Sequence, residues 1–221
     1  MVKIVEQKSH KKLITIILLG VAIVVTTFFY TAGIAHAKNI SDAQNIKING
    51  LYLKTPTTIN NFQLTDNHGK EFTKANLKNH WTLMFFGFTN CGYVCPTTLT
   101  AMKNLSQILQ KEIPANQLPQ ILFISVDPAR DTVEKLNSYV TAFNPNFIGA
   151  RGDTANLDIL KKQFHIVAVK VPGKGKNNYA INHTAEIMLI NPDAKLQAFF
   201  SFPVNPAQIA NQYQLILKAF G

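Results

Sequence analysis

Residues Trp81–Met102 have the sequence WTLMFFGFTNCGYVCPTTLTAM and contain both cysteines of the 221-residue chain. The bulky apolar run Trp81–Phe86 predicts a buried strand. Pro96, followed by apolar residues at helical spacing, predicts a helix with proline in its first turn. The two cysteines therefore lie at a strand-to-helix turn.

The spacing of Cys91 and Cys95 limits what the pair can do. If the turn coils, residues four apart bring their Cβ atoms to about 5 to 6 Å. That separation suits a disulfide after a slight adjustment, and it also suits two thiolates that bind one metal ion. Because N–H groups at a helix N-terminus favour an anion, we expect the pKa of these thiols to be lowered.

The N-terminal segment predicts a membrane location. Residues 13–37 contain no Lys, Arg, Asp or Glu, and Leu13–Ala35 is long enough to cross a hydrocarbon core of about 30 Å. Four lysines and one acid precede it, so we expect the rest of the chain on the periplasmic or outer face of the cytoplasmic membrane. Ala35-His36-Ala37 also fits a signal-peptide cleavage site. Residues 1–37 are therefore either an uncleaved single-pass anchor, which we favour, or a signal segment.

Location and charge narrow the function classes. Outside the cytoplasm, thiols oxidise unless they are reduced or bound to metal. A purely structural disulfide between Cys91 and Cys95 would close a very small loop and contribute only about 2 kcal/mol, so this alternative is weaker. The net charge is +10, but the basic residues are scattered and form no stripe. We therefore expect no nucleic-acid partner.

The remaining patterns predict an α/β domain over residues 58–221, joined to the membrane segment by a polar tether at residues 38–57. Strands alternate with helices through the first half of the domain, which implies parallel pairing, and hairpins follow. The predicted strands are Asn60–Asp66, Glu71–Phe72, Trp81–Phe86, Ile121–Val126, Phe147–Ala150, Ile166–Val171, Tyr179–Ile181, Glu186–Ile190 and Leu196–Phe200. The predicted helices are Pro96–Lys111, Thr132–Phe143, Thr154–Gln163 and Pro206–Lys218.

One polar loop follows the Ile121–Val126 strand. We interpret Asp131 as the cap of the next helix, with Glu134 at the capping-box spacing. A cap does not require Asp127 or Arg130, and for these two residues we expect an ion pair that shapes the loop.

The motif C-x-x-x-C-P at the first strand-helix turn, preceded by Phe86-Gly-Phe-Thr89, resembles the SCO/SenC family of copper-delivery proteins. Three further segments agree with this resemblance: Ser125-Val-Asp-Pro-Ala-Arg-Asp-Thr132, Asn182-His183-Thr184 and Asn191-Pro-Asp193. The resemblance covers roughly residues 57–220. It implies a thioredoxin-like fold with a central mixed sheet, flanking helices and inserted hairpins, preceded by one transmembrane helix.

The same resemblance implies a mononuclear copper site made by Cys91, Cys95 and His183. Its use would be to help assemble the dinuclear copper centre of cytochrome c oxidase, with the copper-binding subunit of the oxidase as partner. Two thiolates and an imidazole suit Cu(I), whereas structural zinc normally has four protein ligands.

The sequence departs from the family pattern around the expected copper. The family usually has proline and an acidic residue between the cysteines and aspartate before the histidine, whereas this chain has Gly92, Tyr93 and Asn182. Negative charge near the copper is therefore lower than usual. Since neighbouring groups tune metal affinity, the copper affinity and the preferred oxidation state stay open.

Two enzymatic alternatives use the same cysteines. In a thiol:disulfide oxidoreductase, Cys91 and Cys95 would be the catalytic dithiol acting on a redox partner, and His183 would not be needed. A peroxidase is the weakest alternative, because the Thr-x-x-Cys of peroxiredoxins is absent: Phe88 and Gly92 occupy the positions three before the cysteines.

Overall fold

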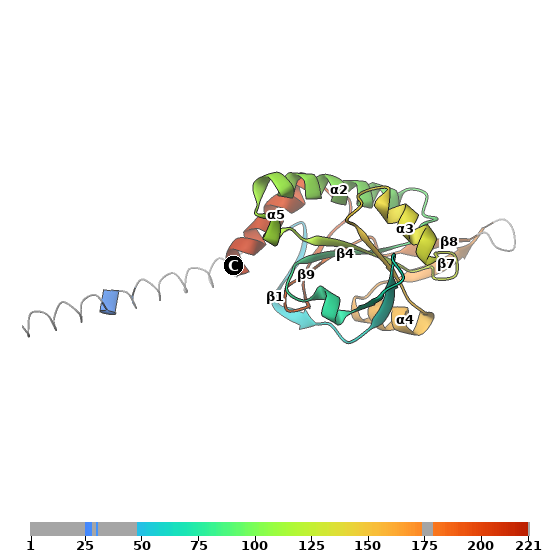
Figure 1. Ribbon diagram of the computed structural model, residues 1–221, viewed down its shortest axis with the longest axis horizontal. Helices are drawn as coiled ribbons and strands as arrows, with labels where there is room; N and C mark the ends of the chain where they lie inside the picture. The colour runs from blue at the N-terminus through green and yellow to red at the C-terminus, as the bar shows by residue number, and fades with distance from the viewer. Residues whose placement is uncertain (1–24, 28–29, 31–47, 174–178, 221) are drawn as a thin grey trace, which may run out of the picture. The chain divides into compact units, whose positions relative to one another are not determined.

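The computed structural model describes residues 25–27, 30, 48–173 and 179–220 (Figure 1). The chain divides into two compact units, one of residues 46–215 and the other of the two chain ends. Residues 25–27 and 30 are helical, and the rest of the predicted membrane segment lies outside the described residues. Within the described ranges, no helix has the length and apolar character needed to cross a membrane.

An eight-stranded sheet organises the unit of residues 46–215, with the order β1-β10-β9-β4-β5-β6-β2-β3. Its strands are β1 (Gly50–Thr58), β2 (Gln63–Asp66), β3 (Glu71–Thr73), β4 (Thr82–Gly87), β5 (Gln120–Ser125), β6 (Ile148–Arg151), β9 (Ile187–Ile190) and β10 (Lys195–Phe200). Strands β4, β5 and β6 are parallel, whereas β9 is antiparallel to β4. The predicted central mixed sheet is therefore confirmed.

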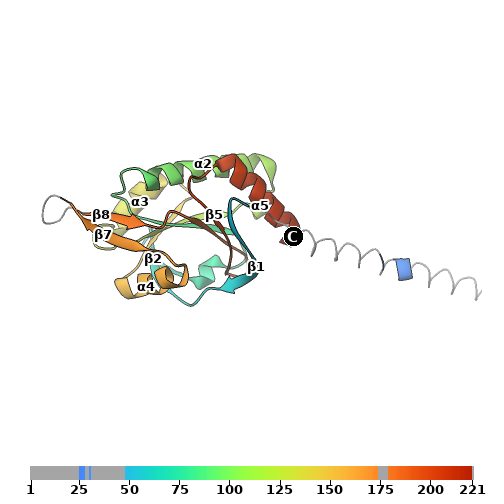
Figure 2. The same cartoon turned by 180° about the vertical axis from the view of Figure 1, so that it is seen from behind.

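Helices cover both faces of this sheet. They are α2 (Val94–Glu112), α3 (Val133–Thr141), α4 (Thr154–Gln163) and α5 (Pro206–Phe220), with short 3-10 turns η1 (Lys74–Leu77) and η2 (Ala115–Gln117). Helices α2 and α3 and the start of α5 lie on one side of the sheet, and α4 lies on the other (Figures 1 and 2).

The core packs against both faces of β4, and the long helix α2 covers one of these faces. All six residues of β4 are buried, and α2 buries Leu99, Met102, Leu105 and Leu109, the spacing of one helical face. Because β4 leads directly into the cysteine turn, the rigid core fixes where that turn begins.

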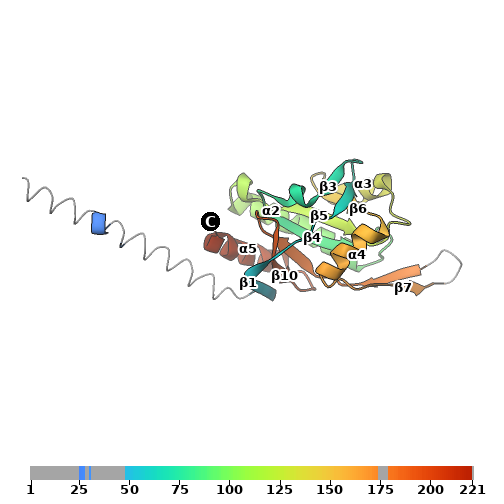
Figure 3. The same cartoon turned by 90° about the horizontal axis from the view of Figure 1, so that it is seen from below.

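A separate two-stranded hairpin completes the unit. Strands β7 (Ala168–Pro172) and β8 (Tyr179–His183) pair with each other and, in the part of the chain described, form no ladder with the large sheet. The hairpin projects beyond the sheet in all three views and is clearest in Figure 3. His183 is the last residue of β8 and lies opposite Ala168, so the strand extends two residues beyond the predicted strand Tyr179–Ile181.

Strand β1 corrects the predicted tether. Residues Gly50–Thr58 pair with the outer side of β10, whereas we expected residues up to 57 to be an unstructured linker. No residue of β1 is buried, so the strand is held by backbone hydrogen bonds and carries no apolar alternation. Pro56 lies in the interval where the register shifts, a position that tolerates the missing N–H.

Candidate metal centre

The structure brings together the three residues selected from the sequence. Cys91 lies in the turn after β4, Cys95 lies in the first turn of α2, and His183 ends β8. Their ligand atoms all lie within 4.8 Å of one another. Nε2 of His183 is 3.4 Å from Sγ of Cys95. Two sulfurs and one nitrogen thus converge on a space that one metal ion can occupy.

The cysteine turn coils as the spacing predicts. The N–H of Cys91 donates to the carbonyl of Phe88 at 3.2 Å, and the N–H of Cys95 donates to Sγ of Cys91 at 3.4 Å. Both thiols are free. Cys91 is partly exposed, whereas Cys95 is fully buried, so a partner molecule can reach the sulfur of Cys91 first.

Gly87 makes room for the buried sulfur. A Cβ atom at this last residue of β4 would lie 2.9 Å from Sγ of Cys95 and 2.6 Å from the ring of Phe123. Any side chain at this position would therefore push on the sulfur or on the aromatic core. The requirement for glycine at residue 87 is therefore steric, and nothing in the neighbouring sequence indicates it.

The expected lowering of the thiol pKa is wrong for Cys95. Burial raises the pKa of Cys95 well above the ordinary thiol value, and the opposing backbone hydrogen bond with Phe88 is a smaller effect. Desolvation penalises the thiolate more than the helix N-terminus favours it. In the metal-free protein Cys95 is therefore a neutral thiol, and metal binding there displaces its proton.

The imidazole of His183 is held in the tautomer that a metal needs. Its Nδ1 donates to the carbonyl of Thr184 at 2.9 Å, which leaves the lone pair of Nε2 directed at Cys95. Burial lowers the pKa of His183 and outweighs the opposite effect of the Thr184 hydrogen bond. The rings of Phe85 and Phe88 pack edge-on against the imidazole, at centroid distances of 6.0 and 5.8 Å. A backbone-oriented neutral imidazole is the usual form of a metal-binding histidine.

Asp131 supports the cysteine turn and does not cap the next helix. The cap of α3 is Thr132, whose side chain accepts from the N–H of Lys135. Asp131 is fully buried and accepts from the N–H and hydroxyl of Thr89, at 3.0 and 2.5 Å. It also accepts from the hydroxyl of Ser125 at 2.6 Å. The capping-box interpretation failed because Ser125 at the end of β5 and Thr89 after the neighbouring strand β4 donate to the same carboxylate.

The expected ion pair between Asp127 and Arg130 is confirmed. It also reaches the β7–β8 hairpin, which the sequence did not indicate. The hydroxyl of Tyr179 donates to Oδ1 of Asp127 at 2.6 Å, and Nη1 of Arg130 donates to the carbonyl of Tyr179 at 2.9 Å.

The three positions that depart from the family pattern, Gly92, Tyr93 and Asn182, are all exposed. They therefore border the site on its solvent side, and none of them supplies a carboxylate. The only ligand types that the described residues gather here are the two thiols and the imidazole.

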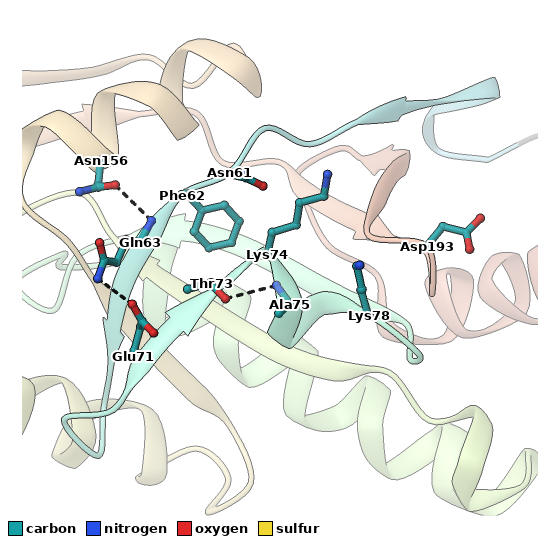
Figure 4. A pocket seen from close by; sticks show the side chains of 10 residues that line it. All are labelled: Asn61, Phe62, Gln63, Glu71, Thr73, Lys74, Ala75, Lys78, Asn156 and Asp193. Atoms are coloured by element: carbon teal, nitrogen blue, oxygen red, sulfur yellow. Dashed lines mark hydrogen bonds between the residues drawn. The ribbon is translucent and has the colours of Figure 1, made fainter.

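A second hollow shares no residue with this cluster. An open groove of about 680 Å³ is lined by residues of β2, β3, η1 and α4, and Figure 4 shows the side chains that line it. Several of its polar groups satisfy one another: Gln63 Nε2 donates to Oε1 of Glu71 at 2.6 Å, and the N–H of Gln63 donates to Oδ1 of Asn156 at 3.1 Å. Because none of its lining residues is Cys91, Cys95 or His183, the groove does not form part of the metal centre.

Comparisons with known proteins agree on one family. The model of the SCO1/SenC family matches residues 52–218. The zebrafish (Danio rerio) "Protein SCO2 homolog, mitochondrial" is 33% identical over 159 residues, which are 72% of this chain and 57% of that protein. The chain therefore spans little more than half the length of this relative.

Two solved structures share the fold. The copper-bound structure of Bradyrhizobium japonicum ScoI has a TM-score of 0.64 and 34% identity, and the match covers 72% of this chain and 98% of that one. The copper-bound structure of Arabidopsis thaliana ScoI has a TM-score of 0.68 and 25% identity, with 73% and 99% covered.

Proposed function

The chain belongs to the SCO1/SenC family, and from this premise we propose that it is a copper metallochaperone. In this proposal it binds one copper ion through Cys91, Cys95 and His183 and passes the ion to a recipient protein. The recipient is the copper-binding subunit of cytochrome c oxidase, whose dinuclear copper centre the protein helps to assemble.

The observation that carries the proposal is the convergence of three ligand atoms within 4.8 Å from three separate segments of the chain. Thiolate and imidazole ligands select copper over hard cations such as magnesium and calcium. The described residues supply three ligands to this cluster, whereas structural zinc sites usually have four. Copper-bound relatives of the same fold add support.

Each residue has a distinct part in holding the cargo. Thr184 fixes the His183 tautomer, so Nε2 is ready to bind without losing a proton. Cys95 supplies a buried sulfur that excludes water from one side of the ion. Cys91 is partly exposed, so a thiolate or imidazole of the recipient can approach on its side and replace the ligands one at a time.

The proposed location follows from the N-terminal segment. The charge-free residues 13–37, with basic residues before them, support an anchor in the cytoplasmic membrane with the domain on the outer face. A dinuclear copper centre exposed on that face would be within reach of an anchored domain. Added protease should digest the domain in spheroplasts, and complete protection would overturn this topology.

The test of copper binding uses the full-length protein, purified reduced and without oxygen. After incubation with Cu(I) and removal of loosely bound metal, metal analysis should find one copper per chain. A parallel sample offered equimolar zinc and copper should retain copper. Absence of bound copper, or retention of zinc instead, would sink the metallochaperone proposal.

A second candidate function, thiol:disulfide oxidoreductase, is favoured by the asymmetry of the two sulfurs. The exposed thiolate of Cys91 would attack a partner disulfide, form a mixed disulfide and expel one partner thiolate. Cys95 would then attack the sulfur of Cys91, and its proton would pass to the second partner thiolate as that thiolate leaves. The products would be a Cys91–Cys95 disulfide and a partner reduced by two electrons.

A further inference from the structure

The hairpin that carries His183 lacks the support that the cysteines have. Cys91 and Cys95 follow directly from β4, whose six residues are all buried. By contrast, β7 and β8 pair with each other and, over the described residues, join no other strand. Four of the five residues of β7 are exposed. Apart from the short chain connection to β9, which begins at Ile187, side-chain contacts therefore determine where the end of β8 lies.

Packing alone leaves the hairpin incompletely supported. Ile181 is the only residue of β8 that is buried. A cavity of about 170 Å³ lies beneath it, lined in part by Asp127, Leu157 and Ala168. On this side the strand therefore has few protein atoms against which it could be held in position.

A polar clamp joins the other end of β8 to the loop after β5. The hydroxyl of Tyr179 donates to Asp127, and Arg130 bonds both to Asp127 and to the carbonyl of Tyr179. The Arg130 guanidinium also stacks on the Tyr179 ring, with its carbon 3.6 Å from the ring centroid. Asp127 is fully buried, so this clamp is anchored in the core.

The clamp is also connected to the metal centre through one aromatic ring. The Phe88 ring lies 5.8 Å from the Arg130 guanidinium and 5.8 Å from the His183 imidazole. The chain from Tyr179 to His183 is a single short strand. Tyr179 and Arg130 are therefore connected to the imidazole both along the strand and through the Phe88 ring.

We propose that Asp127, Arg130 and Tyr179 are positioning residues that hold His183 over the cysteine pair. This inference rests on the proposed copper function but adds a part of the chain that does not contact the ion. The same loop ends in Asp131, which holds Thr89 at the start of the cysteine turn. The five-residue loop from Asp127 to Asp131 thereby fixes the cysteine turn and His183 relative to each other.

The decisive variant is Tyr179→Phe, which removes one hydroxyl and keeps the ring under Arg130. Tyr139→Phe is the matched control, because the Tyr139 hydroxyl is buried and has no hydrogen-bond partner among the described residues. Arg130→Lys is a second clamp variant, since it keeps the charge but loses the planar guanidinium that stacks on the Tyr179 ring and bonds Asp127 and the Tyr179 carbonyl through separate nitrogens.

The measurement is Cu(I) affinity of the full-length proteins, by competition with a chromogenic chelator. Tyr179→Phe and Arg130→Lys should each weaken copper binding about tenfold. This is the smaller end of the loss in metal affinity that follows when a residue that orients a metal ligand, without binding the metal, is replaced. Tyr139→Phe should bind copper as the original protein does. Equal affinity in Tyr179→Phe and the original protein would overturn the clamp while leaving the copper function intact.

A metal-free readout separates the two proposals. With histidine labelled by ¹⁵N, the ring signals of His183 should shift or broaden in Tyr179→Phe but not in Tyr139→Phe, because the imidazole is less restrained. Unchanged ring signals in Tyr179→Phe would overturn the clamp, whether or not the original protein binds copper. Absence of bound copper in the original protein would reject the metallochaperone function but would leave this test of the clamp valid.

Discussion

Nε2 of His183 lies 3.4 Å from Sγ of Cys95, although 88 residues separate them in the chain. The contact joins the end of the β7–β8 hairpin to the first turn of α2. It places a neutral imidazole beside a buried thiol. A change to either group should therefore alter copper binding, disulfide formation or stability.

Replacement of His183 separates copper binding from dithiol chemistry. His183→Ala should weaken copper binding at least tenfold, about 1.4 kcal/mol, and abolish the thiolate-to-Cu(II) charge-transfer absorption. The reducible Cys91–Cys95 disulfide should persist, because it needs no imidazole. His68→Ala, in an exposed turn, is the control and should behave as the original protein. Unchanged copper affinity in His183→Ala would make oxidoreductase the better function, whereas Cys91→Ser and Cys95→Ser should each abolish both activities.

The metal-free protein should form a reversible disulfide between Cys91 and Cys95. Their sulfurs lie within 4.8 Å in the reduced state, and the turn that carries Cys91 is partly exposed and can adjust. Mass spectrometry after alkylation should show the loss of two hydrogen atoms on mild oxidation, reversed by a reductant. Copper loading should protect both sulfurs. Two alkylated cysteines after oxidation would show that the turn keeps them apart.

Gly87 should be far less tolerant of a methyl group than Gly92, although both lie near the cysteines. Gly87→Ala places Cβ within contact distance of the Phe123 ring and of the Cys95 sulfur, so it should lower the free energy of unfolding by about 1 to 3 kcal/mol. A Cβ at Gly92 would meet nothing within 4 Å, and Gly92→Ala should change stability by less than about 0.5 kcal/mol. Urea unfolding measures both, and equal stabilities would contradict the proposed crowding.

Asp131 should matter through its hydrogen bonds to Thr89 and Ser125. Asp131→Ala leaves the buried hydroxyl of Ser125 and the N–H and hydroxyl of half-buried Thr89 without their acceptor, so the free energy of unfolding should fall by about 3 kcal/mol or more. Glu134→Gln, at an exposed position of the same segment, should stay within about 0.5 kcal/mol of the original protein. Equal stability of Asp131→Ala and Glu134→Gln would show that the hydrogen bonds of Asp131 with Thr89 and Ser125 do not stabilise the fold.

Acid should destabilise the metal-free protein through His183. Its folded pKa is lowered below the ordinary value of 6.5, chiefly by burial, so the unfolded chain binds more protons between the folded pKa and 6.5. Stability contributed by the neutral imidazole is therefore complete above 6.5 and declines as the pH falls through this window. Urea unfolding across that range should show a smaller decline in His183→Gln than in the original protein. Parallel curves for the two proteins would contradict the assigned shift.

Local patterns were sufficient for the elements that bury their own side chains. The continuous apolar run of β4 and the helical spacing in α2 depend on residues close in sequence, so both were predicted correctly, as was the coiled cysteine turn between them. Strand β1 was missed because an exposed edge strand is defined by its backbone pairing with β10 and not by any apolar period. The role of Asp131 was misassigned because capping is a local rule, while Asp131 accepts from Thr89, 42 residues away in the chain, and from Ser125 at the end of β5.

The candidate ligands of this protein could be read from its sequence: two cysteines four residues apart after a buried strand, and a histidine in a motif that resembles one family. The environment of these groups depended on the folded chain. Whether a thiol is buried, which imidazole nitrogen is free, and what holds a hairpin in place depend on residues distant in the chain. Desolvation and hydrogen bonding act through space, so the raised pKa of Cys95 and the clamp from Asp127 to Tyr179 became visible only when the chain was folded.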